Sequence, residues 1–231
     1  MQPPAGVHWV QRRLRDVADG DDWLSADERA VQARLVVPKR RADWRLGRWT
    51  AKVALSVALH VEPSLVSILA AEDGAPEVFV GGLRQAISLS ISHRAGVGLA
   101  AVGRDVVVGG DLELIEPRSP AFVSEWFGAR EQESIAAARD TQRHHELTCL
   151  LWSVKEASAK VLREGLRLDP RSASVELTDD GDALDPGSPW LRSSVEWPTE
   201  GRVVPGWWRI DGSMVCTIAA DRPTGTPIEL R

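Results

Sequence analysis

The chain has 231 residues, of which 43% are hydrophobic and 26% are charged, and its formal net charge is −5 at pH 7. These values are typical of a globular protein with one large or two small domains. The acidic balance argues against a nucleic-acid or acidic-membrane partner, and no apolar run approaches a membrane span. Cys149 and Cys216 form neither a metal pair nor a redox CxxC motif, so with no signal-peptide pattern we expect a cytoplasmic protein.

The N-terminal part of the chain predicts a first strand or short helix followed by two helices. Ser25 and Glu28 form a capping box, which predicts a helix to about Leu35. A longer helix is expected over residues 39–59. Gly47 within it costs about 1 kcal/mol relative to alanine, which indicates that another element packs closely there.

This longer helix carries a row of cations. Arg41, Arg45, Arg48 and Lys52 follow the spacing i, i+4, i+7, i+11 and predict one continuous basic stripe. The stripe is either a solvated face or a platform for phosphates, because guanidinium groups match phosphate oxygens.

A hairpin is expected next. Three apolar residues (Ile87, Leu89, Ile91) alternate with three serines (Ser88, Ser90, Ser92), as in a half-buried strand, and residues 97–102 form the second strand. His93 stands where the first strand enters the turn. It is either an ordinary surface histidine or, with Ser92 and Arg94, part of an anion-binding turn.

A strand beginning at Val106 carries Asp111 and Glu113, two residues apart and therefore on one face. Two carboxylates this close need a cation or an exposed edge. A charged edge strand is one interpretation, and a Mg²⁺ site built from hard oxygen ligands is the other.

After two short helices over residues 117–138, a long helix is expected from about His144. Its core is LWSVKEASAKVL, residues 151–162, and Gly165 is the predicted helix stop. Glu156 and Lys160 are four residues apart on one face, as a surface ion pair or as part of a site. We expect antiparallel strands after this helix, then an irregular tail from Arg222. Helices followed by strands in residues 1–105, and again in 106–220, favour an α+β fold with a coarse two-fold repetition.

Together these motifs resemble the 4′-phosphopantetheinyl transferase superfamily, specifically its longer, surfactin-type group. The resemblance is carried by the basic helix with Gly47, Arg48 and Lys52, the G-x-P at residues 74–76, Ser92-His93, GDLE at 110–113 and WSVKEASAK at 152–160. The last two motifs are specific as a pair.

The resemblance implies Mg²⁺-dependent transfer of phosphopantetheine from coenzyme A to a serine of an apo acyl or peptidyl carrier protein, with release of adenosine 3′,5′-bisphosphate. It also implies a monomer of two similar α+β halves, with coenzyme A between them. The halves would be residues 1–105, with the basic helix and the SH turn, and 106–231, with the metal and catalytic motifs.

The same resemblance implies roles for individual residues. Asp111, Glu113 and Glu156 would hold Mg²⁺, Glu156 would also accept the serine proton, and Lys160 would meet the pyrophosphate. The expected coenzyme A contacts are Arg41, Arg48, Ser92, His93, Lys155 and Lys160, with Lys155 also open to a structural role. Two positions depart from the family pattern. Gly110 replaces an apolar residue and could loosen the strand, and Ala75 replaces a lysine that many members carry.

Two alternatives stay open. A catalytically silent module could bind coenzyme A or a carrier protein, although a binding role would not need Glu156 and the metal ligands together. An unrelated Mg²⁺-dependent phosphodiesterase could also use a DxE motif with a distant glutamate, although the net charge disfavours nucleic acid as its substrate.

Overall fold

The computed structural model describes residues 6–138, 140–164, 168–178 and 190–230, and the chain divides into two compact units. The first unit is Met1–Val108 with Pro227–Arg231, and the second is Gly109–Thr226. Both contain helices and sheets, so the predicted α+β class is confirmed. Within the described ranges, none of the helices has the length and apolarity needed to cross a membrane.

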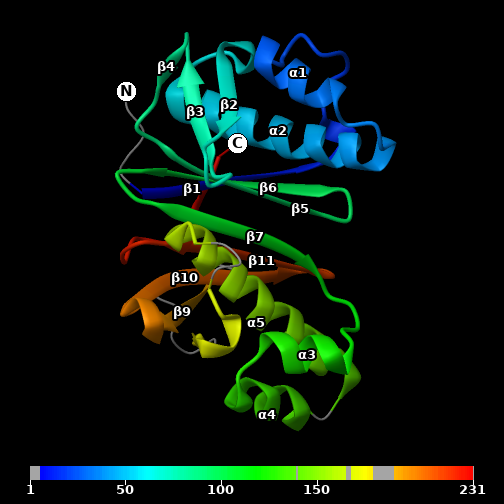
Figure 1. Cartoon of the computed structure of the whole chain (residues 1–231), viewed down its shortest axis with the longest axis vertical. Coiled ribbons are helices and arrows are strands. Elements are labelled where there is room, and N and C mark those ends of the chain that lie inside the picture. The colour runs from blue at the N-terminus through cyan, green and yellow to red at the C-terminus, as the bar shows by residue number, and fades with distance from the viewer. Residues whose placement is uncertain (1–5, 139, 165–167, 179–189, 231) are drawn as a thin grey trace. The chain divides into compact units, whose positions relative to one another are not determined.

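The first unit is built on a sheet of order β12-β1-β6-β5, with α2 lying along one face, and a smaller sheet of order β2-β3-β4 (Figure 1). Its strands are β1 (Gly6–Arg13), β2 (Val66–Ala70), β3 (Pro76–Val80), β4 (Leu83–Arg84), β5 (Ser88–Arg94), β6 (Val97–Arg104) and β12 (Ile228–Glu229). Its helices are α1 (Ala26–Ala33) and α2 (Pro38–Leu59), which confirms both predicted helices.

Small residues bring α2 close to its sheet. Ala51, Ala54 and Ala58 are buried against strand residues such as Val10 and Val102 in one core cluster. At Gly47 an added Cβ would lie 3.1 Å from Cγ2 of Ile91 on β5. The close packing predicted from this glycine is therefore confirmed, and it sets the distance between α2 and the strand that carries Ser92 and His93.

The C-terminal tail is irregular over residues 222–227, as predicted, but it ends in a short strand that was not predicted. Ile228 and Glu229 form β12, which pairs in parallel with His8 and Trp9 of β1, and the backbone N–H of Leu230 donates to the carbonyl of Trp9 at 2.9 Å. The last residues therefore belong to the first unit, although the sequence assigned them to the second half. A parallel partner so far along the chain leaves no short-range turn signal in the sequence.

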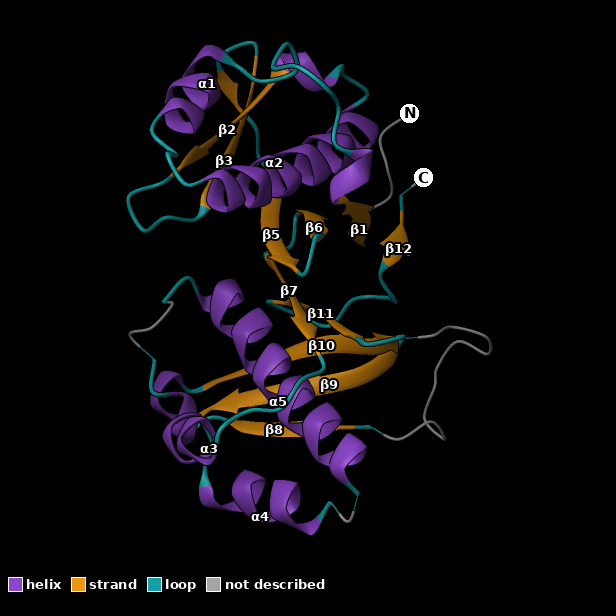
Figure 2. Cartoon of the chain, turned by 90° about the vertical axis from the view of Figure 1, so that its right-hand side faces the viewer, coloured by secondary structure: helices purple, strands orange, loops and turns teal. Residues whose placement is uncertain are grey.

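The second unit is one sheet of order β7-β11-β10-β9-β8, with α5 crossing one of its faces (Figure 2). Its strands are β7 (Val108–Leu114), β8 (Ser174–Leu177), β9 (Leu191–Trp197), β10 (Arg202–Asp211) and β11 (Met214–Ala220). Its helices are α3 (Pro120–Trp126), α4 (Ala129–Ala137) and α5 (Thr141–Leu162). Arg163 ends α5 in the left-handed conformation, φ 60°, while the predicted stop at Gly165 lies outside the described residues.

Equivalent contacts recur in the two units at a constant offset of 103 residues. Helix α2 begins at Pro38 and α5 at Thr141, and each has 22 residues. Each long helix carries a buried lysine paired with a glutamate of the preceding helix, a tryptophan packed edge-on against another, and a left-handed C-cap. The corresponding pairs are Trp23/Trp126, Glu28/Glu131, Trp49/Trp152, Lys52/Lys155 and His60/Arg163. The repetition seen coarsely in the sequence is thus a repetition of specific contacts.

Candidate active site

The basic residues of α2 do not form the predicted continuous stripe. Lys52 is fully buried, 0% exposed, and its Nζ lies 2.7 Å from Glu28 and donates to the carbonyls of Trp23 and Val66. Arg45 pairs with Asp21 and also donates to two backbone carbonyls. These two cations hold the first unit together, so only the remaining arginines of the row are open to a ligand.

Arg48 and His93 are the residues of the first unit that best fit the predicted anion site. The guanidinium of Arg48 is half-buried over the ring of Trp44, 5.2 Å from its centroid, and burial lowers its pKa while Glu28 opposes that shift. An added Cβ at Gly47 would lie 3.6 Å from Cδ2 of His93, so the imidazole packs beside the same turn of α2. His93 is exposed and lies within β5, before the Ala95–Gly96 turn rather than in it.

The other predicted coenzyme A contacts of this unit differ in their surroundings. Ser92 is half-buried on β5, opposite Leu99 of β6. Arg41 is exposed near the start of α2, and its Nε donates to the carbonyl of Leu35 at 3.0 Å. Arg41 therefore keeps its terminal guanidinium nitrogens at the surface.

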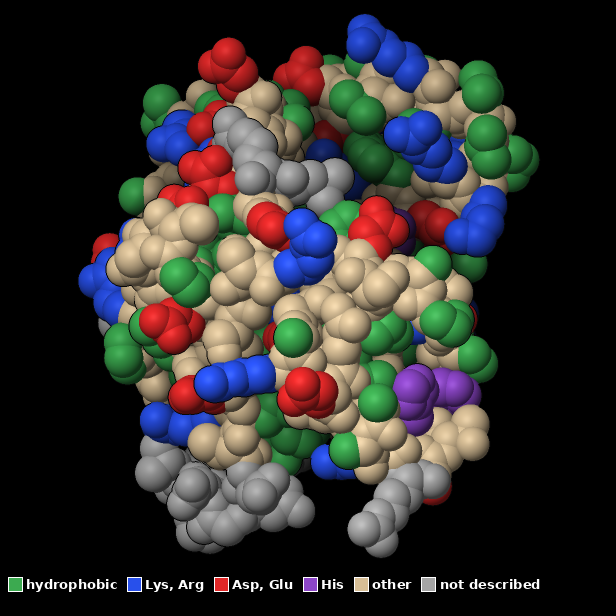
Figure 3. Space-filling view, turned by 60° about the horizontal axis from the view of Figure 1, so that its bottom comes forward, with side chains coloured by type: hydrophobic (Ala, Val, Ile, Leu, Met, Phe, Trp, Pro, Cys, Tyr) green, Lys and Arg blue, Asp and Glu red, His purple; other side chains and the backbone are tan. Residues whose placement is uncertain are grey.

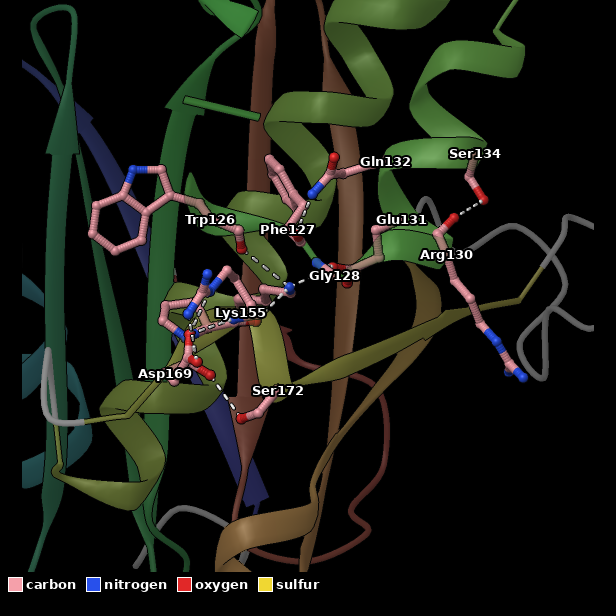
Figure 4. Close-up of polar contacts among 12 residues, drawn as sticks. Trp126, Phe127, Gly128, Arg130, Glu131, Gln132, Ser134, Lys155, Asp169 and Ser172 are labelled. Atoms are coloured by element: carbon pink, nitrogen blue, oxygen red, sulfur yellow. Dashed lines mark hydrogen bonds and ion pairs between the residues drawn. The ribbon is translucent and has the colours of Figure 1, made fainter. Parts of the chain in front are cut away.

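Lys155 is not placed to bind coenzyme A, and that prediction needs correcting. Its side chain is 1% exposed; Nζ lies 2.5 Å from Oε2 of Glu131 and donates to the carbonyls of Pro170 and Trp126 at 2.7 and 3.4 Å (Figure 4). Burial lowers the pKa of Lys155, and Glu131 opposes this. A solvated anion cannot reach an ammonium enclosed in this way, because α5 turns Lys155 into the core.

The second unit gathers the acidic motif residues with Lys160. Asp111 is buried on β7, 6% exposed, and its Oδ1 lies 2.8 Å from Nζ of Lys160 on α5. Lys160 also donates to the carbonyl of Gly110 at 2.9 Å. Gly110 does not loosen the strand, since β7 runs unbroken from Val108 to Leu114. The approach of α5 depends on Gly109, where an added Cβ would come within 1.9 Å of the carbonyl oxygen of Ala157.

Glu156 is the unpaired acid of this group. It is partly buried, and its side chain makes no hydrogen bond or ion pair with the described residues. Burial raises its pKa, the nearby carboxylates of Asp111 and Glu113 raise it further, and Lys160 lowers it. An acid held in this way has a stronger affinity for a proton than an ordinary glutamate has, as a general base requires near neutral pH.

Three further residues support the acidic group, and the sequence reading missed them. Arg118 lies 2.8 Å from Oε2 of Glu113. Ser153 donates to Oδ2 of Asp111 at 2.9 Å, and Thr217 of β11 lies 2.9 Å from Ser153. Ser153 could have been found in sequence, because it stands three residues before Glu156 and so shares its helix face. Arg118 and Thr217 carry no such signal, since they reach the group only through the fold.

The residues present fit a divalent cation by their chemistry. Asp111, Glu113 and Glu156 supply only oxygen donors, which Mg²⁺ prefers, and three carboxylates against the cations of Lys160 and Arg118 leave negative charge in excess. In this structure two of these carboxylates form ion pairs, Asp111 with Lys160 and Glu113 with Arg118. Among the residues whose placement is described, no three acidic, histidine or cysteine side chains already form a metal-binding group.

Comparison with known proteins finds a family that is similar to the segment carrying these residues. Residues 101–185 match the model of the 4′-phosphopantetheinyl transferase superfamily. Over that segment the chain is similar to this superfamily. A relative, the 4′-phosphopantetheinyl transferase HetI of Nostoc sp. (strain PCC 7120 / SAG 25.82 / UTEX 2576), is 28% identical over 158 residues. The aligned stretch covers 68% of this chain and 65% of HetI, so the match spans less than two thirds of the relative's length.

The match to the superfamily covers one part of the predicted site. The segment 101–185 contains the acidic group and Lys160, all from the second unit. Arg41, Arg48, Ser92 and His93 lie before it, in the first unit. Their assignment as coenzyme A contacts therefore stays a prediction.

Proposed function

We propose that this protein transfers the 4′-phosphopantetheine group of coenzyme A to a serine of an apo acyl or peptidyl carrier protein, as an enzyme of the surfactin-type group. The observation that carries the proposal is Glu156: a partly buried carboxylate with a raised pKa and no hydrogen-bond partner among the described residues, next to Asp111 and Lys160. It lies within the segment that matches the superfamily.

In the proposed reaction the carrier serine oxygen attacks the phosphorus on the pantetheine side of the coenzyme A pyrophosphate. A new phosphorus–oxygen bond forms to the serine, and the bond to the bridging oxygen breaks, which releases adenosine 3′,5′-bisphosphate. Glu156 accepts the serine proton as the general base. The Lys160 ammonium stabilises the negative charge that develops on the leaving phosphate.

Asp111, Glu113 and Glu156 would hold Mg²⁺ in this scheme. When bound, the ion supplies positive charge to the pyrophosphate of coenzyme A. Lys160 already places a positive charge 2.8 Å from Oδ1 of Asp111, which indicates that this oxygen is suited to a cation. Arg118 would orient Glu113 by its ion pair at 2.8 Å.

The first unit would supply phosphate contacts for coenzyme A. Arg48 is desolvated and makes no ion pair with a carboxylate of the described residues, and His93 is exposed beside the same helical turn. With Ser92 and Arg41 they offer the donors that phosphate oxygens accept. We further propose that the two units are copies of one α+β unit, on the basis of their shared contacts, and that the protein is a cytoplasmic monomer; its buried free thiols, Cys149 and Cys216, suit a reducing compartment.

The reaction is tested by intact-mass spectrometry of apo carrier proteins of the fatty-acid, polyketide and nonribosomal-peptide types. Each is incubated with the protein, coenzyme A and Mg²⁺. We expect at least one carrier to gain the mass of a phosphopantetheine arm, and Glu156→Gln to abolish the gain while binding coenzyme A. Omission of Mg²⁺ with a chelator should abolish it as well. No gain with any carrier, using protein that binds coenzyme A, would contradict the proposal.

The two alternatives predict different results. A silent binding module would bind coenzyme A or a carrier and leave the carrier mass unchanged. A phosphodiesterase would hydrolyse a phosphodiester without a carrier protein. Only the carboxylate oxygens of the acidic group support the phosphodiesterase. The net charge of −5 does not favour a nucleic-acid substrate, and acidic and basic side chains intermingle on the face drawn in Figure 3.

A further inference from the structure

Ser153 is a fully buried hydroxyl that contacts the central acid of the site. It is 0% exposed on α5, and its Oγ lies 2.9 Å from Oδ2 of Asp111, which is itself 6% exposed. An ionised carboxylate only accepts hydrogen bonds, so the serine is the donor. The single hydroxyl proton of Ser153 is therefore committed to Asp111.

Thr217 orients Ser153 from the sheet. Its Oγ1 lies 2.9 Å from Oγ of Ser153 and 3.0 Å from the backbone carbonyl of Ser153. The hydroxyl of Thr217 donates to this backbone carbonyl, and its Oγ1 lies beside the Ser153 hydroxyl, whose own proton is directed to Asp111. The result is a chain of contacts from Thr217 through Ser153 to the carboxylate, all of it within the second unit.

This chain fixes an otherwise soft rotation. The terminal torsion of an aspartate is broad, so its two oxygens can turn about the Cβ–Cγ bond. In this protein Oδ2 is held by Ser153, while Oδ1 faces Lys160 at 2.8 Å. Ser153 and Lys160 are seven residues apart on α5, about two turns, and so reach the carboxylate from one helix face.

We propose that Ser153 is a positioning residue: it holds Oδ2 of Asp111 so that Oδ1 is presented to the cation that the site uses, Lys160 in this arrangement and a divalent ion when one is bound. This inference rests on the proposed function, since it gives Asp111 its role in that site. Ser153 lies within the WSVKEASAK motif but is not one of its charged residues.

Ser158 is a matched control on the same helix. It too is 0% exposed, its hydroxyl donates to the carbonyl of Lys155 at 2.9 Å, and it accepts from Nε1 of Trp197 at 3.0 Å. Ser158→Ala thus removes a buried hydroxyl with as many close partners, without touching Asp111. A purely structural role for Ser153 would make the two alanine variants alike.

The experiment compares the wild-type protein, Ser153→Ala, Thr217→Val and Ser158→Ala. Mg²⁺ affinity is measured by calorimetry with coenzyme A present, alongside coenzyme A affinity in chelator, unfolding by denaturant, and kcat and KM for carrier modification. We expect both serine variants to lose stability, but only Ser153→Ala to weaken Mg²⁺ binding by roughly 10- to 100-fold, with a matching fall in kcat, as supporting partners of metal ligands do.

Thr217→Val keeps the side-chain volume and should show a smaller loss of Mg²⁺ affinity in the same direction. It also keeps the inference testable if Ser153→Ala does not fold. Equal Mg²⁺ affinities for Ser153→Ala and Ser158→Ala, or an unchanged affinity for Thr217→Val where Ser153→Ala cannot be purified, would overturn the inference alone. A wild-type protein that neither binds Mg²⁺ nor modifies a carrier would overturn the proposed function with it.

Discussion

The Nζ atom of Lys155 lies 2.5 Å from Oε2 of Glu131 in the interior of the second unit, and Lys52 and Glu28 form the same pair at 2.7 Å in the first. In each unit the glutamate is the third residue of a helix whose N-cap backbone N–H donates to it. The lysine therefore joins the long helix to the start of the preceding one. Each pair is a structural link placed at the same point of a repeated unit.

Removing one partner of this buried link should be strongly destabilising. We expect Lys155→Met to lower the free energy of unfolding by about 3–5 kcal/mol, because it leaves the Glu131 carboxylate buried without its cation. Denaturant unfolding followed by tryptophan fluorescence measures this. Replacing both partners, as in Lys155→Met with Glu131→Leu, should recover much of the loss. Lys39→Met breaks an exposed pair with Asp43 and should change stability little.

The same variant tests the corrected role of Lys155. If its ammonium only supports the fold, Lys155→Met that is folded at low temperature should keep the wild-type KM for coenzyme A. Arg48→Gln should raise that KM by contrast, since it removes an arginine with no close carboxylate from the proposed phosphate contacts. A large rise in KM for folded Lys155→Met would restore Lys155 to the binding site.

Ionisation of Glu156 should destabilise the folded protein, so its effect on stability should depend on pH. Its pKa is raised in the folded state, chiefly by burial and then by Asp111, so the folded protein holds this proton more tightly than the unfolded chain does. Glu156 is protonated in both states well below 4.5, the ordinary pKa of a glutamate, and the folded state loses stability as the pH rises through the folded pKa.

Glu156→Gln removes this penalty. In metal-free buffer we therefore expect the variant to be more stable than wild type at pH 7, with a difference in Tm that shrinks as the pH is lowered towards 4.5. Thermal unfolding across this pH range measures the effect. Glu133→Gln, on the exposed surface of α4, serves as the control and should show no such trend. A constant Tm difference at every pH would contradict the expectation.

Gly109 should be required for the seating of α5 on β7. An added Cβ there would lie 1.9 Å from the backbone carbonyl oxygen of Ala157, and neither backbone can yield cheaply. We expect Gly109→Ala to destabilise the protein by about 1–3 kcal/mol, as overpacking of a core does, and to lower kcat by moving Asp111. Gly225→Ala meets nothing within 4 Å and should behave as wild type in unfolding and kinetic assays.

Truncation after Thr226 should weaken the first unit, although the lost residues follow the second in sequence. It removes β12 and so leaves the outer backbone groups of β1 unpaired. Hydrogen exchange should show faster exchange in β1 and unchanged protection in β10 and β11, which belong to the other unit. Faster exchange confined to β10 and β11 would contradict the assignment of the tail.

The sequence by itself determined the α+β class, the long helices and the resemblance to the 4′-phosphopantetheinyl transferase superfamily. Helical periodicity extends over many turns of residues 39–59 and 151–162, and the GDLE and WSVKEASAK motifs are local, so neither needs the fold to be recognised. It also contained the repeated tryptophans and lysines, at positions 103 apart, which the coarse reading did not resolve.

Only the tertiary structure decided which charged residues are buried. Lys52 continues the i, i+4, i+7, i+11 row of Arg41, yet it lies in the core, because the basic row and the apolar face overlap on α2 and the chain supplies Glu28 there. Lys155 and Lys160 likewise lie on one helix, yet Lys155 is buried against Glu131 of α4 whereas Lys160 is partly exposed beside Asp111 of β7. Spacing along a helix fixes the relative directions of side chains, whereas their partners come from α1, α4 and the sheets, whose approach depends on packing between distant segments.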